Sequence, residues 1–437
     1  MKTIALLFAV FLLSISCDLS MQGTKDNPSY TARIAWDSGI SSGAFHQSHT
    51  VDGDSVYFYG WPPGYILPRD EIFPEYNLTR LDAETGSLIW RSELTFDYIV
   101  YCQPIVIGDY VFVFLLDKYM ICFNKETGEH TAFAEVADIP GGEDFRIMQN
   151  ITLHNQYLYF GYFGYPVEDY FVRIDATAIN HDGDPNALQT ITPEVLWNPS
   201  PKQGTPQAKA VIYNNVVYTS TKIYLNTDTI YRTVEIAGFD IDTKEMVFHA
   251  EFGGTEDGDV PFPETGGADD PILIHDGILY YLSWSISAWD LQTGAQLYRH
   301  VFTYDTPEPL MYAPTDITLQ PVYYEGKIYY ISRTSYTPDS HRNTHCIDAA
   351  TGELVWNDIA KGSATLYNNP VIAHGRLYVP QILGFRVYDP ATGALIGNDT
   401  SFHGHNLGRS VLYNDYLICI RDDELSEQPL VAVYVGK

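Results

Sequence analysis

The sequence is poor in basic residues and carries a strong negative charge. Of its 437 residues, 25 are Lys or Arg and 55 are Asp or Glu, which gives a formal net charge of −30. A polyphosphate partner would be repelled by this charge, and no cluster of Lys or Arg offsets it. We therefore expect no nucleic-acid partner and interpret the acidity as a solvated surface that keeps the protein soluble.

Cysteine is scarce as well, with five residues and no spacing that matches a zinc site. Apart from Cys17, the cysteines are Cys102, Cys122, Cys346 and Cys419, which could pair in an exported protein. Cys102 and Cys122 fall on the predicted first and third strands of one sheet. Two strand spacings separate them by roughly 9.5 Å, which is beyond disulfide reach. We expect four buried free thiols.

Common catalytic and metal-binding motifs are missing. The sequence has no Gly-rich phosphate loop, no G-x-S-x-G and no H-E-x-x-H. The stretch "NHDGDPN" (180–186) places Asp182 and Asp184 at alternate positions, as calcium loops do, but it lacks the distal Glu of an EF-hand. We interpret it as ordinary loop chemistry, with calcium at these two residues as the alternative. The "HGH" stretch (403–405) is a second weak metal candidate.

The N-terminus resembles an export signal. A single Lys, an apolar run from Ile4 to Leu13 and small residues before Cys17 predict a secretion signal that is too short to span a membrane. Cys17 resembles the lipidated first residue of bacterial lipoproteins, although Ser14 stands where these usually carry an aliphatic residue. We predict a signal over 1–17, lipidation at Cys17 and a flexible tether over 18–31. The expected location is the cell envelope, with the outer membrane favoured; a plain cleaved signal is the alternative.

Aromatic residues are abundant, at 14% of the chain with 34 Tyr, which favours strands. One phrase recurs along the chain as "LDAETGSLIW" (81–90), "FNKETGEHTAF" (123–133), "WDLQTGAQLY" (289–298), "IDAATGELVW" (347–356) and "YDPATGALIG" (388–397). Its Asp can accept backbone N–H bonds from the residues two and three positions on, and its Gly supplies the positive φ of a tight turn. The aromatic residue four positions after Gly is expected to fill the gap against the next sheet.

Between these turns stand pairs of apolar strands, so each unit of about 50 residues is predicted to be a four-stranded antiparallel meander. Outer-strand landmarks fall at Trp90, Phe133, Trp197, Phe248, Tyr298, Trp356 and Ile396. The last unit has only three strands, and "ARIAWDSGI" (32–40), with Trp36, supplies the missing one. The sequence therefore predicts an all-β, eight-bladed β-propeller over 32–437 that is closed by an N-terminal strand.

The repeated phrase resembles the tryptophan-docking motif Ala-x-Asp-x-x-Thr-Gly-x-x-x-Trp of the quinoprotein alcohol dehydrogenase-like (PQQ-like repeat) propellers. The docking residues assigned on this basis are Trp36, Asp82, Gly86, Trp90, Trp197, Asp290, Gly294, Asp348, Gly352 and Trp356. The resemblance covers residues 32–437 and is specific for fold, whereas fold and chemistry separate readily.

The resemblance implies two functional branches. One contains dehydrogenases that use pyrroloquinoline quinone with Ca²⁺ and typically carry an adjacent Cys-Cys pair and a catalytic Asp. The other contains non-enzymatic lipoproteins of the BamB type, which take part in outer-membrane protein assembly. This chain has no Cys-Cys pair. We therefore expect a monomeric, non-catalytic, BamB-like scaffold with membrane or envelope proteins as partners and no cofactor. The alternatives are a propeller that binds a small ligand or glycan and a PQQ-dependent dehydrogenase.

A polar residue precedes each predicted innermost strand. These residues, in blade order, are Ser48, Gln103, Asn150, Lys209, Asp270, Gln320, Asn369 and Arg409. In a propeller they are expected to ring one mouth of the central channel. One interpretation is that they are merely solvated strand ends; the other is that they bind a ligand or a partner's loop. A further candidate for partner binding is the aromatic and Pro-rich loop over 59–76.

Overall fold

The computed structural model describes the propeller strands and their short turns. The described residues are 33–41, 49–60, 76–96, 103–115, 118–140, 143–147, 150–165, 168–198, 204–206, 209–224, 232–253, 271–282, 285–301, 316–317, 320–333, 341–361, 369–380, 384–399, 410–420 and 429–435. The predicted signal, the tether, Cys17 and Cys102 lie outside them, as do the "HGH" stretch and most of the 59–76 loop.

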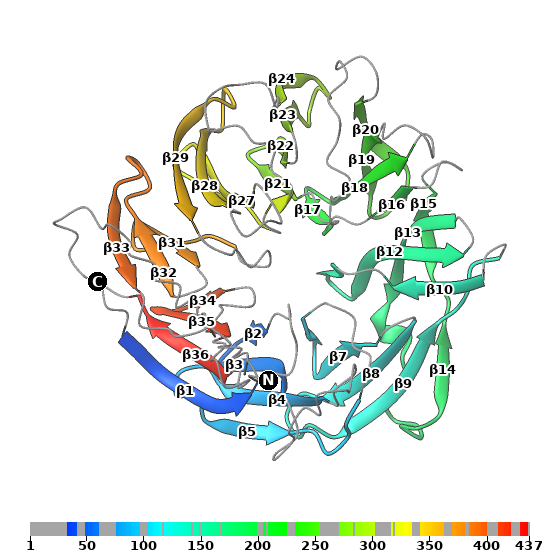
Figure 1. Ribbon diagram of the computed structural model, residues 1–437. Coiled ribbons are helices and arrows are strands. Elements are labelled where there is room, and N and C mark those ends of the chain that lie inside the picture. The colour runs from blue at the N-terminus through cyan, green and yellow to red at the C-terminus, as the bar shows by residue number, and fades with distance from the viewer. Residues whose placement is uncertain are drawn as a thin grey trace, which may run out of the picture.

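Eight sheets, antiparallel except for one added strand in blade two, stand around a central axis (Figure 1). Blade one contains β2 (Thr50–Asp52), β3 (Ser55–Gly60), β4 (Asn77–Asp82) and β5 (Leu88–Arg91). Blade two contains β6 (Ile105–Ile107), β7 (Tyr110–Phe114), β8 (Tyr119–Asn124), β9 (His130–Val136) and β14 (Leu188–Ile191). Blade three contains β10 (Glu143–Ile147), β11 (Thr152–His154), β12 (Tyr157–Tyr165), β13 (Glu168–Asp175) and β15 (Glu194–Trp197), with the short 3-10 helix η1 (Ala176–Ala178) after β13.

The remaining blades repeat the plan. Blade four contains β16 (Gly204–Pro206), β17 (Val211–Tyr213), β18 (Val216–Tyr224), β19 (Arg232–Asp240) and β20 (Met246–Gly253). Blade five contains β21 (Ile272–His275), β22 (Ile278–Leu282), β23 (Ser285–Asp290) and β24 (Gln296–Val301). Blade six contains β25 (Asp316–Ile317), β26 (Val322–Tyr324), β27 (Lys327–Arg333), β28 (His341–Asp348) and β29 (Leu354–Lys361). Blade seven contains β30 (Val371–Ala373), β31 (Arg376–Pro380), β32 (Phe385–Tyr388) and β33 (Leu395–Asp399).

The ring is closed by the N-terminal strand, as the sequence predicted. Blade eight contains β34 (Val411–Tyr413), β35 (Tyr416–Ile420), β36 (Pro429–Tyr434) and, as its outermost strand, β1 (Arg33–Ser41). The strands β1 and β36 pair antiparallel, with Arg33 opposite Tyr434 and Asp37 opposite Val431. The eight-bladed propeller fold is therefore confirmed, with the two ends of the chain joined in one sheet.

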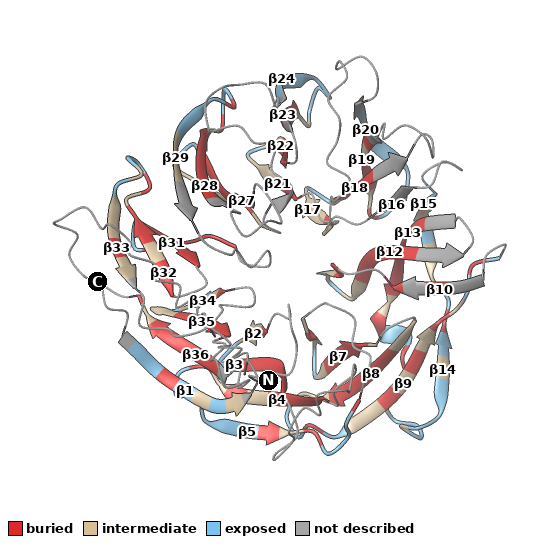
Figure 2. Cartoon of the chain, in the orientation of Figure 1, coloured by how far each residue is buried: buried red, intermediate tan, exposed pale blue. Residues whose placement is uncertain are grey.

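The hydrophobic core lies between neighbouring blades rather than inside any one of them. One cluster joins blades eight and one through Trp36, Val56 and Ile418, and another joins blades four and five through Phe248, Ile272 and Tyr281. Buried residues accordingly follow the middle strands of every blade, while exposed residues gather on the outer ones (Figure 2). Each blade is thus stabilised by its two neighbours, and closure couples all eight.

Two features of the sheets go beyond the predicted meander. In blades three, four and six the innermost layer is split into two short strands, such as β10 and β11, that both pair with the same second strand. In blade two a fifth strand, β14, pairs parallel to the outer strand β9. It belongs to the insertion before Trp197, which returns to the preceding blade before the chain completes blade three.

Three cysteines fall within the described residues. Cys122, Cys346 and Cys419 are buried free thiols, which agrees with the expectation for these three. Burial raises the pKa of Cys346 to about 11 and that of Cys122 still further, so both are expected to be unreactive. Within the described part of the chain, no helix has the length and apolar character needed to cross a membrane.

Candidate functional site

The repeated Asp-Thr-Gly turn has the predicted geometry. Asp82 Oδ1 accepts the backbone N–H groups of Glu84 and Thr85 at 3.1 and 2.8 Å, and the Thr85 hydroxyl at 2.8 Å. These bonds favour the carboxylate, so the hydroxyl and N–H groups hold the pKa of Asp82 below its usual value. Gly86 follows at φ +70°, in the left-handed region that suits glycine.

Aromatic side chains on the outer strands dock onto the turn of the next blade. The indole Nε1 of Trp36 donates to Ala83 O at 3.1 Å across the closure seam, and that of Trp356 donates to Pro390 O at 3.0 Å. Each ring also covers a turn glycine, because a Cβ on Gly86 would lie 2.5 Å from Trp36 and one on Gly393 would lie 2.6 Å from Trp356. The absence of a side chain on the glycine is what allows the ring to approach.

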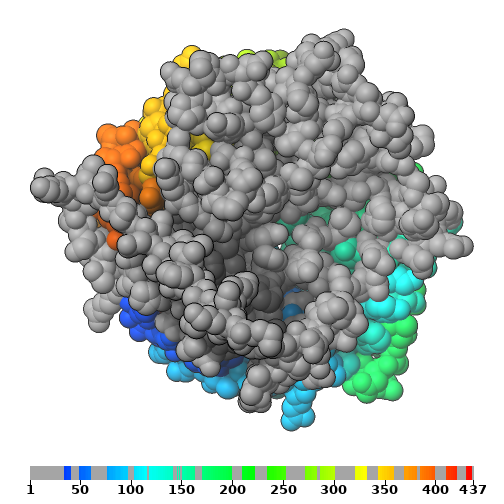
Figure 3. All heavy atoms as spheres, viewed as in Figure 1, coloured from blue at the N-terminus to red at the C-terminus, as the bar shows by residue number. Residues whose placement is uncertain are grey.

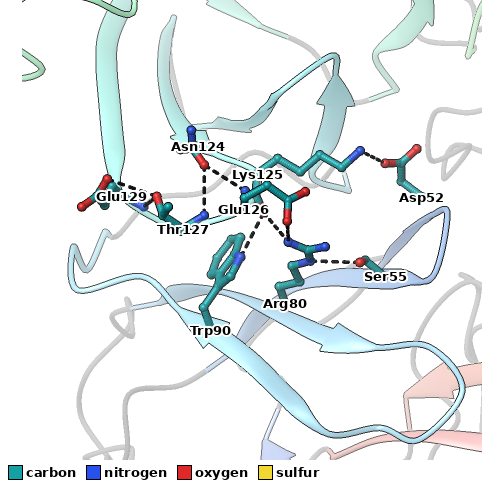
Figure 4. Close-up of polar contacts among 9 residues, drawn as sticks. All are labelled: Asp52, Ser55, Arg80, Trp90, Asn124, Lys125, Glu126, Thr127 and Glu129. Carbon is teal, nitrogen blue, oxygen red and sulfur yellow. Dashed lines mark hydrogen bonds and ion pairs between the residues drawn. The ribbon is translucent and has the colours of Figure 1, made fainter.

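The contact between blades one and two shows this docking together with a polar cluster (Figure 4). Trp90 Nε1 and Arg80 Nη1 both donate to Lys125 O, at 3.0 and 2.8 Å. Arg80 also pairs with Glu126 at 2.8 Å, and Lys125 Nζ reaches Asp52 at 2.5 Å. The indole of Trp90, the guanidinium of Arg80 and the carboxylate of Asp52 therefore all bind the turn of blade two. We interpret this cluster as structural.

Docking aromatics occur where the next blade offers a turn. In blades two and seven the docking position, four residues after the turn glycine, is Ala132 and Gly397, since Cys122 pairs with Ala132 and Val387 with Gly397. The landmarks Phe133 and Ile396 lie on the outer strands β9 and β33, as predicted, one residue away from this docking position. The blades that follow, three and eight, have the helix η1 and the chain's last strand in place of the turn, so no ring is needed.

The other assigned docking residues vary. Tyr298 donates to Ala349 O at 3.0 Å and covers Gly352, where Asp348 caps the turn. Asp290 caps its own turn through Thr293 N–H at 2.8 Å, but a Cβ on Gly294 would meet nothing within 4 Å. Trp197 is buried and packs 5.9 Å from Phe239.

Blade four departs from the pattern, because Lys244 occupies the glycine position of its turn. Lys244 adopts φ +64° and pairs with Glu194 of blade three. Arg173 also binds Glu194, at 2.6 Å, and donates to Ile241 O at 2.7 Å. This polar cluster ties blades three and four at the place where a ring covers a glycine between blades one and two.

The predicted polar ring is only partly within the described residues. Gln103, Lys209 and Gln320 are half-buried, and Asn150 and Asn369 are buried, each two residues before an innermost strand. Ser48, Asp270 and Arg409 lie outside the described residues. By sequence number these three also stand two residues before the innermost strands β2, β21 and β34, so their place in the ring stays a prediction.

A pocket of about 370 Å³ lies on the channel wall of blades one to four. Its lining residues are Thr50, Val51, Asp52, Gln103, Pro104, Ile105, Val106, Ile151, Thr152, Leu153 and Lys209. Two of its hydroxyls tie neighbouring blades, since Thr50 donates to Pro104 O and Thr152 donates to Ala210 O at 2.8 Å. The pocket thus combines an apolar wall with Gln103 and Lys209 of the predicted ring.

The pocket does not fit a quinone with calcium. Ca²⁺ takes six to eight oxygen ligands, largely carboxylates and carbonyls. Asp52 is the one carboxylate among the lining residues, and it is bound to Lys125. Nowhere in the described ranges do three His, Cys, Asp or Glu side chains come together as a metal site would require. No catalytic step through such a cofactor can be derived from these residues.

The calcium-loop candidate adopts a turn. Asn180 Oδ1 accepts the N–H of Asp182, and Asp184 Oδ1 accepts the N–H of Asn186, each at 3.0 Å. Gln189 closes the loop by bonding the backbone of Asn180 through both of its side-chain atoms at 2.8 Å. Asp184, one of the two candidate residues, and its neighbour Asn180 therefore cap backbone groups, which is the ordinary role of Asx turns.

The sequence reasoning missed an exposed apolar band, which we call the apolar rim. It consists of Leu88, Ile89, Met246, Val247, Leu297, Leu354 and Val355, all between 43% and 56% exposed. They stand two and three residues after the turn glycine, or after Lys244 in blade four, at the start of β5, β20, β24 and β29 (Figure 2). The sequence pattern that could have predicted the rim is the pair of apolar residues between the turn glycine and the aromatic residue, such as Leu88 and Ile89 before Trp90.

A repeated β-bulge explains why adjacent residues are both exposed. In blade one Arg80 pairs with Trp90 and Leu81 with Leu88, which leaves Ile89 as an extra residue. The same shift leaves Val247 and Val355 extra in blades four and six. A bulge bends the strand and interrupts the alternation of its side chains, so both apolar residues face outward. In the space-filling view, described residues are visible at the margin of the molecule, blue and cyan along its lower edge and orange at its left (Figure 3).

No family model matches the sequence, and no curated protein matches it either. Among solved structures, a europium-containing methanol dehydrogenase is similar over 89% of this chain and 85% of its own, with 12% identity and a TM-score of 0.62. The quinohemoprotein alcohol dehydrogenase from Comamonas testosteroni is similar over 93% of this chain and 77% of its own, with 12% identity and a TM-score of 0.61. BamB from Moraxella catarrhalis is similar over 85% of this chain and 98% of its own, with 13% identity and a TM-score of 0.45. At these identities the two dehydrogenase structures show the fold alone: the chain has the eight-bladed fold of the quinoprotein alcohol dehydrogenase propellers.

Proposed function

We propose that this chain is a non-catalytic scaffold of a bacterial cell envelope that binds other proteins through its apolar rim. The observation that carries the proposal is the recurrence of exposed apolar pairs at one register of blades one, four and six, with Leu297 at the same place in blade five. Single exposed apolar residues are ordinary, but a repeated apolar band is typical of interaction surfaces.

The exposure of the rim favours contact with a partner protein. Leu88 of blade one is 52% exposed and Val247 of blade four is 56% exposed, so a partner that covers either part of the rim removes apolar surface from water at about 25 cal/mol per Å². The bulges keep this surface from acting as a flat, sticky edge between copies of the chain. Apolar side chains on strands protected in this way suit selective docking of a folded partner.

The envelope location rests on the N-terminal sequence. The apolar run and Cys17 support export and a lipid anchor, which would hold the propeller at a membrane surface as a monomer. Its partners would then be membrane or envelope proteins, and a BamB-like part in outer-membrane protein assembly is the specific form of this proposal. The proposal includes neither a cofactor nor a nucleic-acid partner.

The proposal is tested by co-purification after mild detergent extraction. The rim variant is Leu88→Ser, Val247→Ser and Val355→Ser; because these side chains are exposed, each change is expected to alter stability by at most about 0.5 kcal/mol. A matched control changes exposed residues of the same turns, namely Glu84→Ser, Glu245→Ser and Glu353→Ser. The wild type and the control should retain membrane proteins that the rim variant loses. Equal retention by all three would contradict the proposal.

The channel-wall pocket favours a second candidate function, the binding of a small anionic ligand or acidic glycan. Lys209 would supply the charge and Gln103 a hydrogen-bonding group beside the apolar wall. An acidic sugar should then raise the melting temperature of the wild type, and Lys209→Ala should abolish the rise. If Lys209 is only a solvated strand end, the variant should differ from the wild type by less than about 0.5 kcal/mol in stability and keep all its interactions.

A further inference from the structure

The fifth strand of blade two shows how an outer edge of this propeller takes up an added strand. β14 runs parallel to β9, with Leu188 opposite Phe133 and Ile191 opposite Val136. Besides the ladder, Ala137 N–H donates to Ile191 O at 2.8 Å and the Thr190 hydroxyl donates to Glu135 at 3.2 Å, and the Ile191 side chain is buried. The chain itself thus provides an example of strand addition at a blade edge.

The outer strand of blade four repeats the chemistry of that edge. Counted from the docking position, which is Ala132 in blade two and Phe248 in blade four, Glu251 corresponds to Glu135. Glu251 is exposed. In the described sheet β20 is the end strand, whereas β9 is followed by β14. The acidic side chain that binds the added strand in blade two is therefore present and accessible in blade four.

The direction of the backbone groups matches as well. In blade two Val136 N–H donates inward to Lys118 O, and Ala137 N–H donates outward to β14. Because the direction alternates along a strand, the equivalent outward N–H groups in blade four are those of His249, Glu251 and Gly253. After the bulge at Val247, β20 continues in regular register from Phe248 to Gly253, and a regular edge of this kind is a template for pairing.

We propose that the outer edge of β20 binds an extended, basic segment of a partner protein as a strand parallel to β20. The inference rests on the proposed function and names the partner chemistry for one part of the same surface. The added strand would carry Lys or Arg where β14 carries Thr190, facing Glu251, and an apolar residue directly after it, where β14 carries Ile191. Main-chain hydrogen bonds would supply affinity, and these two side chains would supply selectivity.

The acidic side chains at the edge of β20 are the reason to expect a basic partner segment. Glu235 of β19 and Glu251 of β20 stand directly opposite each other, and like charges in that arrangement are unfavourable. His249 lies on the same face, with its Nε2 3.9 Å from Glu235. A cation beside Glu251 would relieve the repulsion. A second copy of the chain would instead bring two such edges and two net charges of −30 together.

A labelled peptide tests the proposal. The probe is a fluorescent peptide of residues 186–194 with Thr190→Lys, and its binding to the intact protein is followed by anisotropy. Glu251→Pro removes the outward N–H and the carboxylate but keeps the inward ladder, which edge strands tolerate. Glu251→Lys keeps the N–H and reverses the charge. Glu245→Lys, in the same blade and also exposed, is the charge-matched control.

The wild type and Glu245→Lys should bind the probe alike, while both Glu251 variants should bind it at least about tenfold more weakly, as expected when one hydrogen bond to a charged group is lost. Equal binding by Glu251→Pro, or no binding to the wild type at about 1 mM peptide, would overturn the proposal. Light scattering that shows a dimer abolished by Glu251→Pro would do so too, because the occupant would then be a second copy. The two proposals can fail separately. If the rim variant loses its co-purified proteins while the probe binds Glu251→Pro as it binds the wild type, strand docking is wrong and the proposed function still holds.

Discussion

The docking of Trp36 on Gly86 can be measured with a pair of matched glycine substitutions. Gly86 and Gly294 occupy the same position of the same turn and have nearly the same φ, +70° and +72°. They differ in what lies above them. A Cβ added to Gly86 would lie 2.5 Å from the indole of Trp36, whereas one added to Gly294 would meet nothing within 4 Å.

The expected magnitudes follow from these distances. Gly294→Ala places a Cβ in the left-handed region, which lowers the free energy of unfolding by roughly 1–2 kcal/mol. The loss is reduced by about 0.4–1 kcal/mol because alanine also restricts the unfolded chain. Gly86→Ala has the same terms and must also displace the ring of Trp36, because carbon atoms pack at about 3.5–4.0 Å. Overpacking of this kind typically adds about 1–3 kcal/mol. The displacement also disturbs the 3.1 Å bond from Trp36 to Ala83 O.

Urea unfolding followed by tryptophan fluorescence gives the comparison, with Gly86→Ala expected to be less stable than Gly294→Ala by about 1–3 kcal/mol. A double-mutant cycle isolates the cause. In a Trp36→Ala background, itself destabilised by about 3–5 kcal/mol, Gly86→Ala should cost no more than Gly294→Ala does in the wild type. If the two glycine variants are equally stable in the wild-type background, the ring does not dock as described.

Three further predictions concern the ring closure, the thiols and the buried histidines. A chain that begins at residue 45 lacks β1 and should melt well below the mature protein, since β36 loses its partner; equal melting would refute the closure. Mass spectrometry of peptides prepared under non-reducing conditions should find Cys122, Cys346 and Cys419 unbridged, and a bridged peptide would contradict the strand placement. Burial lowers the pKa of His49 and of His345 to about 4. Each histidine therefore contributes its full stability above the unfolded pKa near 6.5. This stability is lost as the pH falls from 6.5 towards 4, at about 1.4 kcal/mol per pH unit for each histidine. His49→Gln should flatten the measured slope between pH 6.5 and 4 by that amount, and an unchanged slope would show that His49 is protonated in the folded protein.

The propeller could be predicted because its information is local and repeated. Each Asp-Thr-Gly turn contains its own hydrogen-bonding groups and its own left-handed glycine, as at Asp82 and Gly86. Counting these turns identifies six blades, and Trp197 and the three strands after the last turn indicate the other two. The need for a closing strand followed from the three strands left in the last unit, and Trp36 identified the segment that supplies it.

What failed depended on register or on distant pairing. Phe133 and Ile396 lie on outer strands as predicted, but neither stands at the docking position, because residue type alone does not give the distance from the glycine. β14 was missed because its parallel partner β9 lies more than 50 residues earlier, and no local pattern specifies such a pair. The apolar rim could be recognised only once β5, β20, β24 and β29 were known to be the end strands of their described sheets.

Photo-cross-linking in intact cells tests the central claim, that the rim binds protein, most directly. A photoreactive residue is placed at Val247 or Val355 on the rim, and at Leu153 or Leu412, which are also exposed but lie on innermost strands. The account predicts discrete cross-linked envelope proteins from both rim positions and none from the two inner ones. Cross-links from Leu153 or Leu412 with none from the rim would contradict it and place the interaction at the channel.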